Sequence, residues 1–251
     1  MNLRWRKKRK FYNAARCLPG LFPLGLALVF LSNTGGQNTG QPMPAAGTRG
    51  MVSSGHSLAT QAGLEILKKG GNAFDAAVAV AAALNIVEPM MSGIGGYGTI
   101  LIYDAGTSRI RFLNSSGRIP RAVDSDAFRE PTPEYKKNRQ GAKAVSTPGN
   151  VHAWEAMSKE YGRLAWKELF GAAIKLAEEG FVLDPRTAAT IESAFSEFPK
   201  QAQDIYGKEG ASLRAGEKLI QKDLGRSLRR IAEEGPDVFY RGDIGQAIDA
   251  E

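Results

Sequence analysis

The strand-forming residues of this chain are concentrated in one short region, and that concentration restricts what the chain can fold into. Residues 99–103, TILIY, form a nearly continuous apolar run, which is typical of a strand covered on both faces. After the turn-forming stretch DAGTS, residues 109–114 alternate Ile110 and Phe112 with arginines. Because one hairpin does not make a stable sheet by itself, two folds remain open. The chain is either a helical domain with a small β-flap, or part of a sheet whose other strands lie outside it.

Helical periodicity accounts for most of the remaining sequence from residue 57 onward. In SLATQAGLEILKK, residues 57–69, small and apolar residues fall on one face of a helix, and Ser57 is placed to cap its start. Residues 72–87 are apolar all round apart from Asp75 and Asn85, which predicts a buried helix. Further helices are expected over residues 151–162, 166–180, 184–195 and 222–236, and the last residues read as the start of another helix.

The N-terminal tail differs in composition from the rest of the chain. The first 50 residues carry eight of the 33 basic residues and no acidic one, since the first acid is Glu65. A basic stretch, MNLRWRKKRKFYNAAR, precedes an apolar run at residues 18–31. This run is shorter than the roughly 20 residues that span a bilayer, and it fits the apolar region of a signal peptide. We therefore expect residues 1–34 to be a signal peptide or signal anchor that directs the protein to the periplasm or the cell exterior. A disordered basic tail is the alternative, and residues 35–50 read as a flexible linker.

Charge and composition argue against two classes of function. The net charge of +7 comes from the tail, so the folded part is close to neutral and lacks the basic surface of a nucleic-acid-binding protein. The single cysteine, Cys17, also lies in the tail, and the chain has two histidines, His56 and His152. A cysteine or histidine metal site is therefore not expected, and no cofactor is implied.

Several glycines precede the first strand, in the stretch MSGIGGYGTILIYDAG at residues 91–106. A dinucleotide-binding fingerprint requires the order strand, glycines, helix, with the pyrophosphate at the helix start. Here the order is helix, glycines, strand, and no P-loop lysine follows. We therefore interpret these glycines as residues that permit tight turns and close contact between backbones.

Arg118 is the strongest candidate for a ligand-binding side chain. It follows the second strand in the loop NSSGRIP, where small neighbours leave room for its guanidinium to reach a cleft and bind a carboxylate through two parallel hydrogen bonds. A solvated arginine or a surface ion pair is the alternative. Ser115 and Ser116 lack the G-x-S-x-G context of a nucleophile. His56, near a helix start, reads as a local hydrogen-bonding residue rather than a catalytic base. The residues alone therefore indicate an α/β domain with no identifiable nucleophile.

Six stretches of the chain match the pattern of a known family in order. They are LKKGGNAFDAAVAVAAALNIVEP, SGIGGYGTILIY, FLNSSGRIP, STPGNVHAWEAMSKEYG, LFGAAIKLAEEGFVL and IAEEGPDVFYRGDIGQAI. Together they cover roughly residues 51–251, and they resemble the γ-glutamyltranspeptidase family, which includes glutathione hydrolases and related acylases.

The resemblance implies an α/β (α+β) fold, the four-layer αββα sandwich of the N-terminal nucleophile hydrolases. Such a protein is made as a precursor that cuts itself into a large and a small subunit, and the new N-terminal threonine is the nucleophile with its own amine as base. Residues 51–251 would supply helices and one hairpin of the large subunit. The implied partners are a small-molecule γ-glutamyl substrate such as glutathione and the protein's own C-terminal small subunit.

The resemblance also implies a role for Arg118. In the family, an arginine in an RExAP-like motif after this strand binds the α-carboxylate of the γ-glutamyl substrate. The match here is partial, because Ser116 and Gly117 precede Arg118 and Ile119 replaces the usual acid.

No threonine in residues 51–251 lies in the Thr-Thr-His-type context where the family's precursors are cut. We therefore expect a large-subunit region truncated before the nucleophile, with no catalytic residue in this chain and no activity by itself. The expected full-length function is hydrolysis of γ-glutamyl amides, by acyl transfer to water or amino acids. A related acylase with another acyl-amide substrate and a non-catalytic partner subunit are the alternatives.

Overall fold

The computed structural model describes residues 45–118, 123–133 and 145–250. The hypothesis of a signal peptide or anchor at residues 1–34 lies outside the described residues, as does most of the linker. Residues Ala46–Glu251 form one compact unit, and the fold described below lies within it. None of the helices in the described ranges is long and apolar enough to cross a membrane.

The first two helices form where the sequence predicts them. Helix α1 spans Ser57–Lys68 and helix α2 spans Ala73–Val87. The expected cap of α1 is wrong by one residue, because His56 rather than Ser57 is the N-cap, and its Nδ1 accepts a hydrogen bond from the backbone N–H of Leu58 (3.2 Å). The ring of His56 thus does what the serine hydroxyl was expected to do.

A buried carboxylate joins α2 to the end of the next helix. Asp75 is fully buried, and it accepts hydrogen bonds from the backbone N–H of Asn72 (2.9 Å) and of Arg163 (3.0 Å). Asn72 in turn caps α2 and donates from Nδ2 to the carbonyl of Tyr161 at 2.5 Å. Tyr161 is the last residue of α3, which spans Asn150–Tyr161. A buried carboxylate is destabilising unless it is hydrogen-bonded. Because the GGNAFDAAVA stretch supplies both Asp75 and its partner Asn72, this stretch has a structural role.

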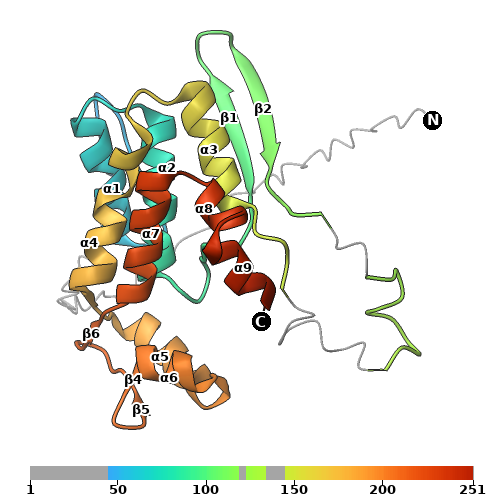
Figure 1. The fold of residues 1–251 in the computed structure, drawn as a ribbon. Helices are drawn as coiled ribbons and strands as arrows, with labels where there is room; N and C mark the ends of the chain where they lie inside the picture. The colour runs from blue at the N-terminus through green and yellow to red at the C-terminus, as the bar shows by residue number, and fades with distance from the viewer. Residues whose placement is uncertain (1–44, 119–122, 134–144, 251) are drawn as a thin grey trace, which may run out of the picture. The chain divides into compact units, whose positions relative to one another are not determined.

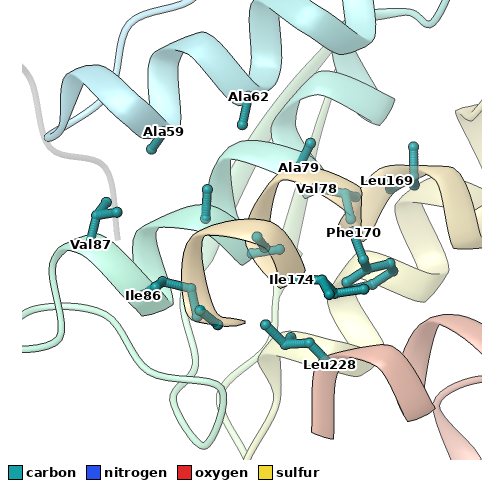
Figure 2. Close-up of a cluster of buried hydrophobic side chains, with 14 of the residues drawn as sticks. Ala59, Ala62, Val78, Ala79, Ile86, Val87, Leu169, Phe170, Ile174 and Leu228 are labelled. Carbon is teal, nitrogen blue, oxygen red and sulfur yellow. The ribbon is translucent and has the colours of Figure 1, made fainter. Parts of the chain in front are cut away.

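Helix α2 lies at the centre of the helical layer, where it contacts α1, α3 and α4. Helix α4 (Gly171–Glu179) also contacts α7 (Lys222–Glu234), and the short helix η2 (Trp166–Phe170) precedes α4. Figure 2 shows the side chains that fill this layer: Ala59, Ala62, Val78, Ala79, Ile86, Val87, Leu169, Phe170, Ile174 and Leu228. Burial of each large apolar side chain among them contributes about 1.5–3 kcal/mol.

The remaining elements are short. The helices are α5 (Pro185–Ala194), η3 (Phe195–Glu197), α6 (Lys200–Tyr206), α8 (Asp237–Tyr240) and α9 (Asp243–Ala250). Two antiparallel pairs of two-residue strands, which the sequence did not predict, join β3 (Phe181–Val182) to β6 (Lys218–Leu219) and β4 (Gly207–Lys208) to β5 (Ala211–Ser212).

The predicted hairpin is present, and it stands beside α3 (Figure 1). Strand β1 (Thr99–Asp104) pairs antiparallel with β2 (Arg109–Asn114) in the register Thr99↔Asn114 to Asp104↔Arg109. On the face toward α3, Ile102 is buried and Arg111 forms an ion pair with Glu160 (2.5 Å).

The other face of the hairpin is apolar and open. It carries two directly paired couples, Leu101 with Phe112 and Tyr103 with Ile110, and these side chains are 63% to 72% exposed. The prediction that the first strand is covered on both faces is therefore wrong for the described residues. Alternation along the second strand is confirmed, but Ile110 and Phe112 face away from the helices, and Leu113 on the other face packs against the core. On the face toward the helices, the Arg111 guanidinium forms its ion pair with Glu160 and lies over the ring of Tyr161, both in α3.

Candidate functional site

Three segments that are far apart in the sequence meet at one place, which we call the loop junction. It consists of residues 93–98 from the glycine-rich loop, residues 115–118 after β2, and residues 146–150 at the start of α3. Each belongs to a different one of the stretches that carry the family resemblance.

Ser115 joins the first two segments. Its hydroxyl accepts a hydrogen bond from the backbone N–H of Gly98 (2.8 Å) and lies 2.9 Å from the Gly98 carbonyl, to which it donates. The backbone N–H of Ser115 donates to the same carbonyl (3.0 Å). Since the hydroxyl holds two backbone segments together, the structure gives it a structural role, in line with the absence of a nucleophile context in the sequence.

The carbonyl of Gly96 joins the first segment to the third. It accepts hydrogen bonds from the backbone N–H groups of Gly149 (2.9 Å) and Asn150 (3.1 Å), and Asn150 also donates from Nδ2 to the Gly93 carbonyl (3.0 Å). A Cβ on Gly149 would lie 1.7 Å from the Ser115 carbonyl oxygen, which only glycine avoids. Close backbone contact, the role expected for the glycine loop, is thus confirmed at Gly96.

Arg118 lies at the edge of the junction. Its side chain is exposed, and no carboxylate among the described residues forms an ion pair with its guanidinium. Its backbone is held, because its carbonyl accepts a hydrogen bond from Thr147 Oγ1 at 3.1 Å. An anchored backbone that carries a guanidinium with no ion-pair partner among the described residues is suited to binding an anionic group by charge-assisted hydrogen bonds.

The two histidines lie outside the loop junction, and each contacts a residue of a distant segment. His56 caps α1, and its Nε2 lies 3.8 Å from Asp184, the residue that caps α5. The ring of His152 stacks on Tyr240 with 3.6 Å between ring centroids. The reading of His56 as a local hydrogen-bonding residue is therefore confirmed.

Tyr240 also supports the third segment of the junction. Its hydroxyl accepts a hydrogen bond from the backbone N–H of His152 (3.1 Å) in the first turn of α3, a helix with no side-chain cap of its own. Burial raises the pKa of Tyr240 above its usual value. With the bonds to Gly96, this contact satisfies backbone donors at the start of α3 from within the chain, which leaves little for an anion to bind there.

The sequence did not point to Thr147, Asn150 or Tyr240 as contributors to a site. All three lie in stretches that carry the resemblance, STPGN and GPDVFY, and that was the available signal. Within the described ranges, no group of three or more His, Cys, Asp or Glu residues could hold a metal ion.

A layer of helices on one face of a hairpin, with an apolar opposite face left open, is the architecture of an incomplete layered α/β fold. Comparison with known proteins identifies that fold. A family model described as gamma-glutamyltranspeptidase matches residues 59–251. A glutathione hydrolase proenzyme of Bacillus subtilis (strain 168) is 38% identical over 207 residues, which cover 80% of this chain and 35% of the relative. An acylase ACY 1 proenzyme of Pseudomonas sp. (strain SE83) is 36% identical over 221 residues, covering 84% and 39%.

Solved structures give the same result. The crystal structure of Helicobacter pylori gamma-glutamyltranspeptidase superimposes with a TM-score of 0.78 at 32% identity, covering 82% of this chain and 61% of that one. The fold is that of the N-terminal nucleophile hydrolases, of which the described residues form a partial α+β example. The chain belongs to the γ-glutamyltranspeptidase family. It spans little more than a third of the length of the two curated relatives described above.

Proposed function

We propose that this chain is the N-terminal part of an exported γ-glutamyltranspeptidase-like hydrolase. The whole protein cleaves the γ-glutamyl amide of glutathione or a similar compound, by acyl transfer to water or to an amino acid. The nucleophilic threonine, with its own amine as base, comes from sequence that follows residue 251. One observation carries the proposal: in a chain of this family, three of the family's stretches meet at a junction that leaves the Arg118 guanidinium exposed.

The partner of this chain is the C-terminal small subunit of the same protein. The second sheet of the layered fold packs on the hairpin. The open face formed by Leu101, Tyr103, Ile110 and Phe112 supports this proposal. Sheets that pack face to face bury one apolar face of each. The names of the two relatives described above, which include the word proenzyme, agree with a precursor.

Arg118 binds the α-carboxylate of the γ-glutamyl group in this proposal. The family's arginine stands four residues before the proline of its motif, whereas Arg118 stands two residues before Pro120. In extended chain, two residues correspond to about 6.6 Å. The long arginine side chain is able to span a distance of this size, so the guanidinium can reach the same carboxylate from a shifted backbone position.

The test uses the full-length protein with whatever coding sequence follows codon 251. Arg118→Ala is expected to raise KM for γ-glutamyl-p-nitroanilide by about 10- to 150-fold, the equivalent of about 1.5–3 kcal/mol for hydrogen bonds to a charged group. Arg109→Ala, at the other end of β2, is the matched control and should leave KM unchanged. An unchanged kcat/KM in Arg118→Ala would remove Arg118 from this role.

A double variant tests the shifted position. Ser116→Arg combined with Arg118→Ala moves the guanidinium to the place that the RExAP-like motif gives it. Recovery of most of the lost affinity would show that the carboxylate lies within reach of both positions, whereas no recovery would show that the loop has been rebuilt around Arg118.

A related acylase is the second candidate function. Ser116, Gly117 and Ile119 depart from the family motif around the arginine, and the ACY 1 relative is named as an acylase. A panel of acyl amides, including β-lactam side-chain amides and poly-γ-glutamate, separates the two candidates. Turnover restricted to γ-glutamyl compounds would exclude the acylase.

Two further proposals concern the ends of the chain. Residues 1–34 are a signal peptide or signal anchor, and N-terminal sequencing of the protein from the cell exterior or periplasm tests this directly. Reading the locus downstream of codon 251 tests the source of the nucleophile. A Thr-Thr-His-like motif in frame or in an adjacent frame supports the enzyme, and its absence supports a non-catalytic partner subunit.

A further inference from the structure

The backbone around Arg118 is held by a residue that is distant in sequence. Thr147 Oγ1 donates to the Arg118 carbonyl at 3.1 Å across 29 positions of the chain. The preceding residue packs against the same threonine, because a Cβ on Gly117 would lie 2.4 Å from both the Cβ and the carbonyl oxygen of Thr147. Thr147 therefore contacts the chain at Arg118 and at the residue before it.

Thr147 is itself carried by an anchored segment. Two residues later, the backbone N–H groups of Gly149 and Asn150 both donate to the Gly96 carbonyl, and Asn150 Nδ2 donates to the Gly93 carbonyl. The segment continues directly into α3, whose first turn is fixed by the Tyr240 hydroxyl. The segment that carries Thr147 is thus hydrogen-bonded both to the glycine-rich loop and to Tyr240.

We propose that Thr147 is a positioning residue for Arg118, and that it sets the direction in which the guanidinium leaves the loop. The inference rests on the proposed role of Arg118 in binding the substrate carboxylate. Two parallel hydrogen bonds to a carboxylate require the planar guanidinium to arrive in one orientation. Fixing the carbonyl of the same residue removes backbone freedom before the substrate binds, which lowers the ordering cost of binding.

The contact is exposed to water, so its contribution is modest. Thr147→Val removes the hydroxyl and keeps the branched shape that packs on Gly117. In the full-length protein it is expected to raise KM for γ-glutamyl-p-nitroanilide by about two- to tenfold, the range for one hydrogen bond. The kcat should change by less than about twofold, because the lost interaction serves binding. Thr147→Ser keeps the hydroxyl and should restore the KM.

Thr190→Val is the matched control. The hydroxyl of Thr190 donates to the Arg186 carbonyl at 3.0 Å within α5, so this substitution removes the same kind of bond outside the loop junction. It should leave KM unchanged. The melting temperature of each variant shows whether the chain has folded, and Thr147→Ala, which also removes the hydroxyl, takes the place of Thr147→Val if the valine variant is unstable.

The decisive measurement is the double variant Thr147→Val with Arg118→Ala. If Thr147 acts through Arg118, adding Thr147→Val to Arg118→Ala causes no further change in KM. An equal increase in both backgrounds would overturn the inference and assign Thr147 a general structural role. If Arg118→Ala raises KM and Thr147→Val does not, the inference fails and the proposed function stands. If Arg118→Ala has no effect, both fail together.

Discussion

Substituting Gly149 tests the loop junction at its tightest point. Gly149 has φ −123° and ψ −15°, which a non-glycine residue can adopt. Gly149→Ala therefore does not strain the backbone dihedral angles, and its effect comes from the atoms that the new Cβ would meet. The new Cβ would lie 1.7 Å from the Ser115 carbonyl oxygen, whereas ordinary contact begins at 3.4 Å. One of the two segments must therefore move by about 1.7 Å, the difference between the 1.7 Å approach and the 3.4 Å of ordinary contact.

A movement of this size breaks the hydrogen bonds from Gly149 and Asn150 to the Gly96 carbonyl, which are 2.9 Å and 3.1 Å long. Two such bonds contribute about 0.5–1.5 kcal/mol each, and overpacking adds about 1–3 kcal/mol. The lower chain entropy of alanine in the unfolded state offsets about 0.4–1 kcal/mol. The net loss in the free energy of unfolding is then about 3 kcal/mol, a large part of the stability of a typical domain.

Urea denaturation of the full-length protein, followed by far-UV circular dichroism, measures this loss. Gly171→Ala is the control, because Gly171 lies at the start of α4 with φ −55°, and a Cβ added there would meet no atom within 4 Å. It is expected to raise stability by up to about 1 kcal/mol. A Gly149→Ala protein that unfolds within about 0.5 kcal/mol of the parent, the usual range for neutral surface changes, would refute the close contact with Ser115.

Two other perturbations test the open hairpin face and the cap of α5. Phe112→Asp should leave the helical layer folded but reduce recovery of a processed small subunit by more than about tenfold, because a charge would be buried between sheets. Ser108→Asp, in the turn of the same hairpin, should not reduce this recovery. Equal recovery for both variants would contradict the packing of a second sheet on this face. At Asp184, the Thr187 hydroxyl and then the backbone N–H groups of Thr187 and Arg186 lower the carboxyl pKa below its ordinary value. Its stabilisation is therefore present above the ordinary pKa and lost as pH falls through the lowered one, so unfolding curves of the parent and of Asp184→Asn should converge as the pH is lowered below the ordinary pKa of the carboxyl. Asp249→Asn on α9 controls for the change in charge, and a constant offset between the Asp184→Asn and parent curves would rule out the linkage.

Local sequence determined where the helices form. The 3.6-residue periodicity and the residues at helix ends depend on contacts within one or two turns, so α1, α2, α3, α5 and α7 begin and end close to their predicted limits. The position of the hairpin was determined in the same way, by one apolar run and one alternating run around a turn. The family could also be recognised, because its stretches are long and occur in order.

Only the tertiary structure decided which face of the hairpin meets the helices. Alternation shows that a strand has two faces and does not say which one packs, and here Glu160 of α3 pairs with Arg111 and leaves Phe112 outside. The two-residue strands were missed for a related reason. Such short pairs depend on neighbours brought together by packing, and two residues carry no detectable period.

The candidate site was determined least by local sequence. The bond from Thr147 to Arg118 spans 29 positions, the bond from Asn150 to Gly93 spans 57, and the contact between His152 and Tyr240 spans 88. The sequence by itself supplied an arginine in a loop of small residues and the glycines around it. The packing of the helices placed the threonine, the asparagine and the tyrosine around that loop, because hydrogen bonds between distant segments form only once the elements that carry them have packed.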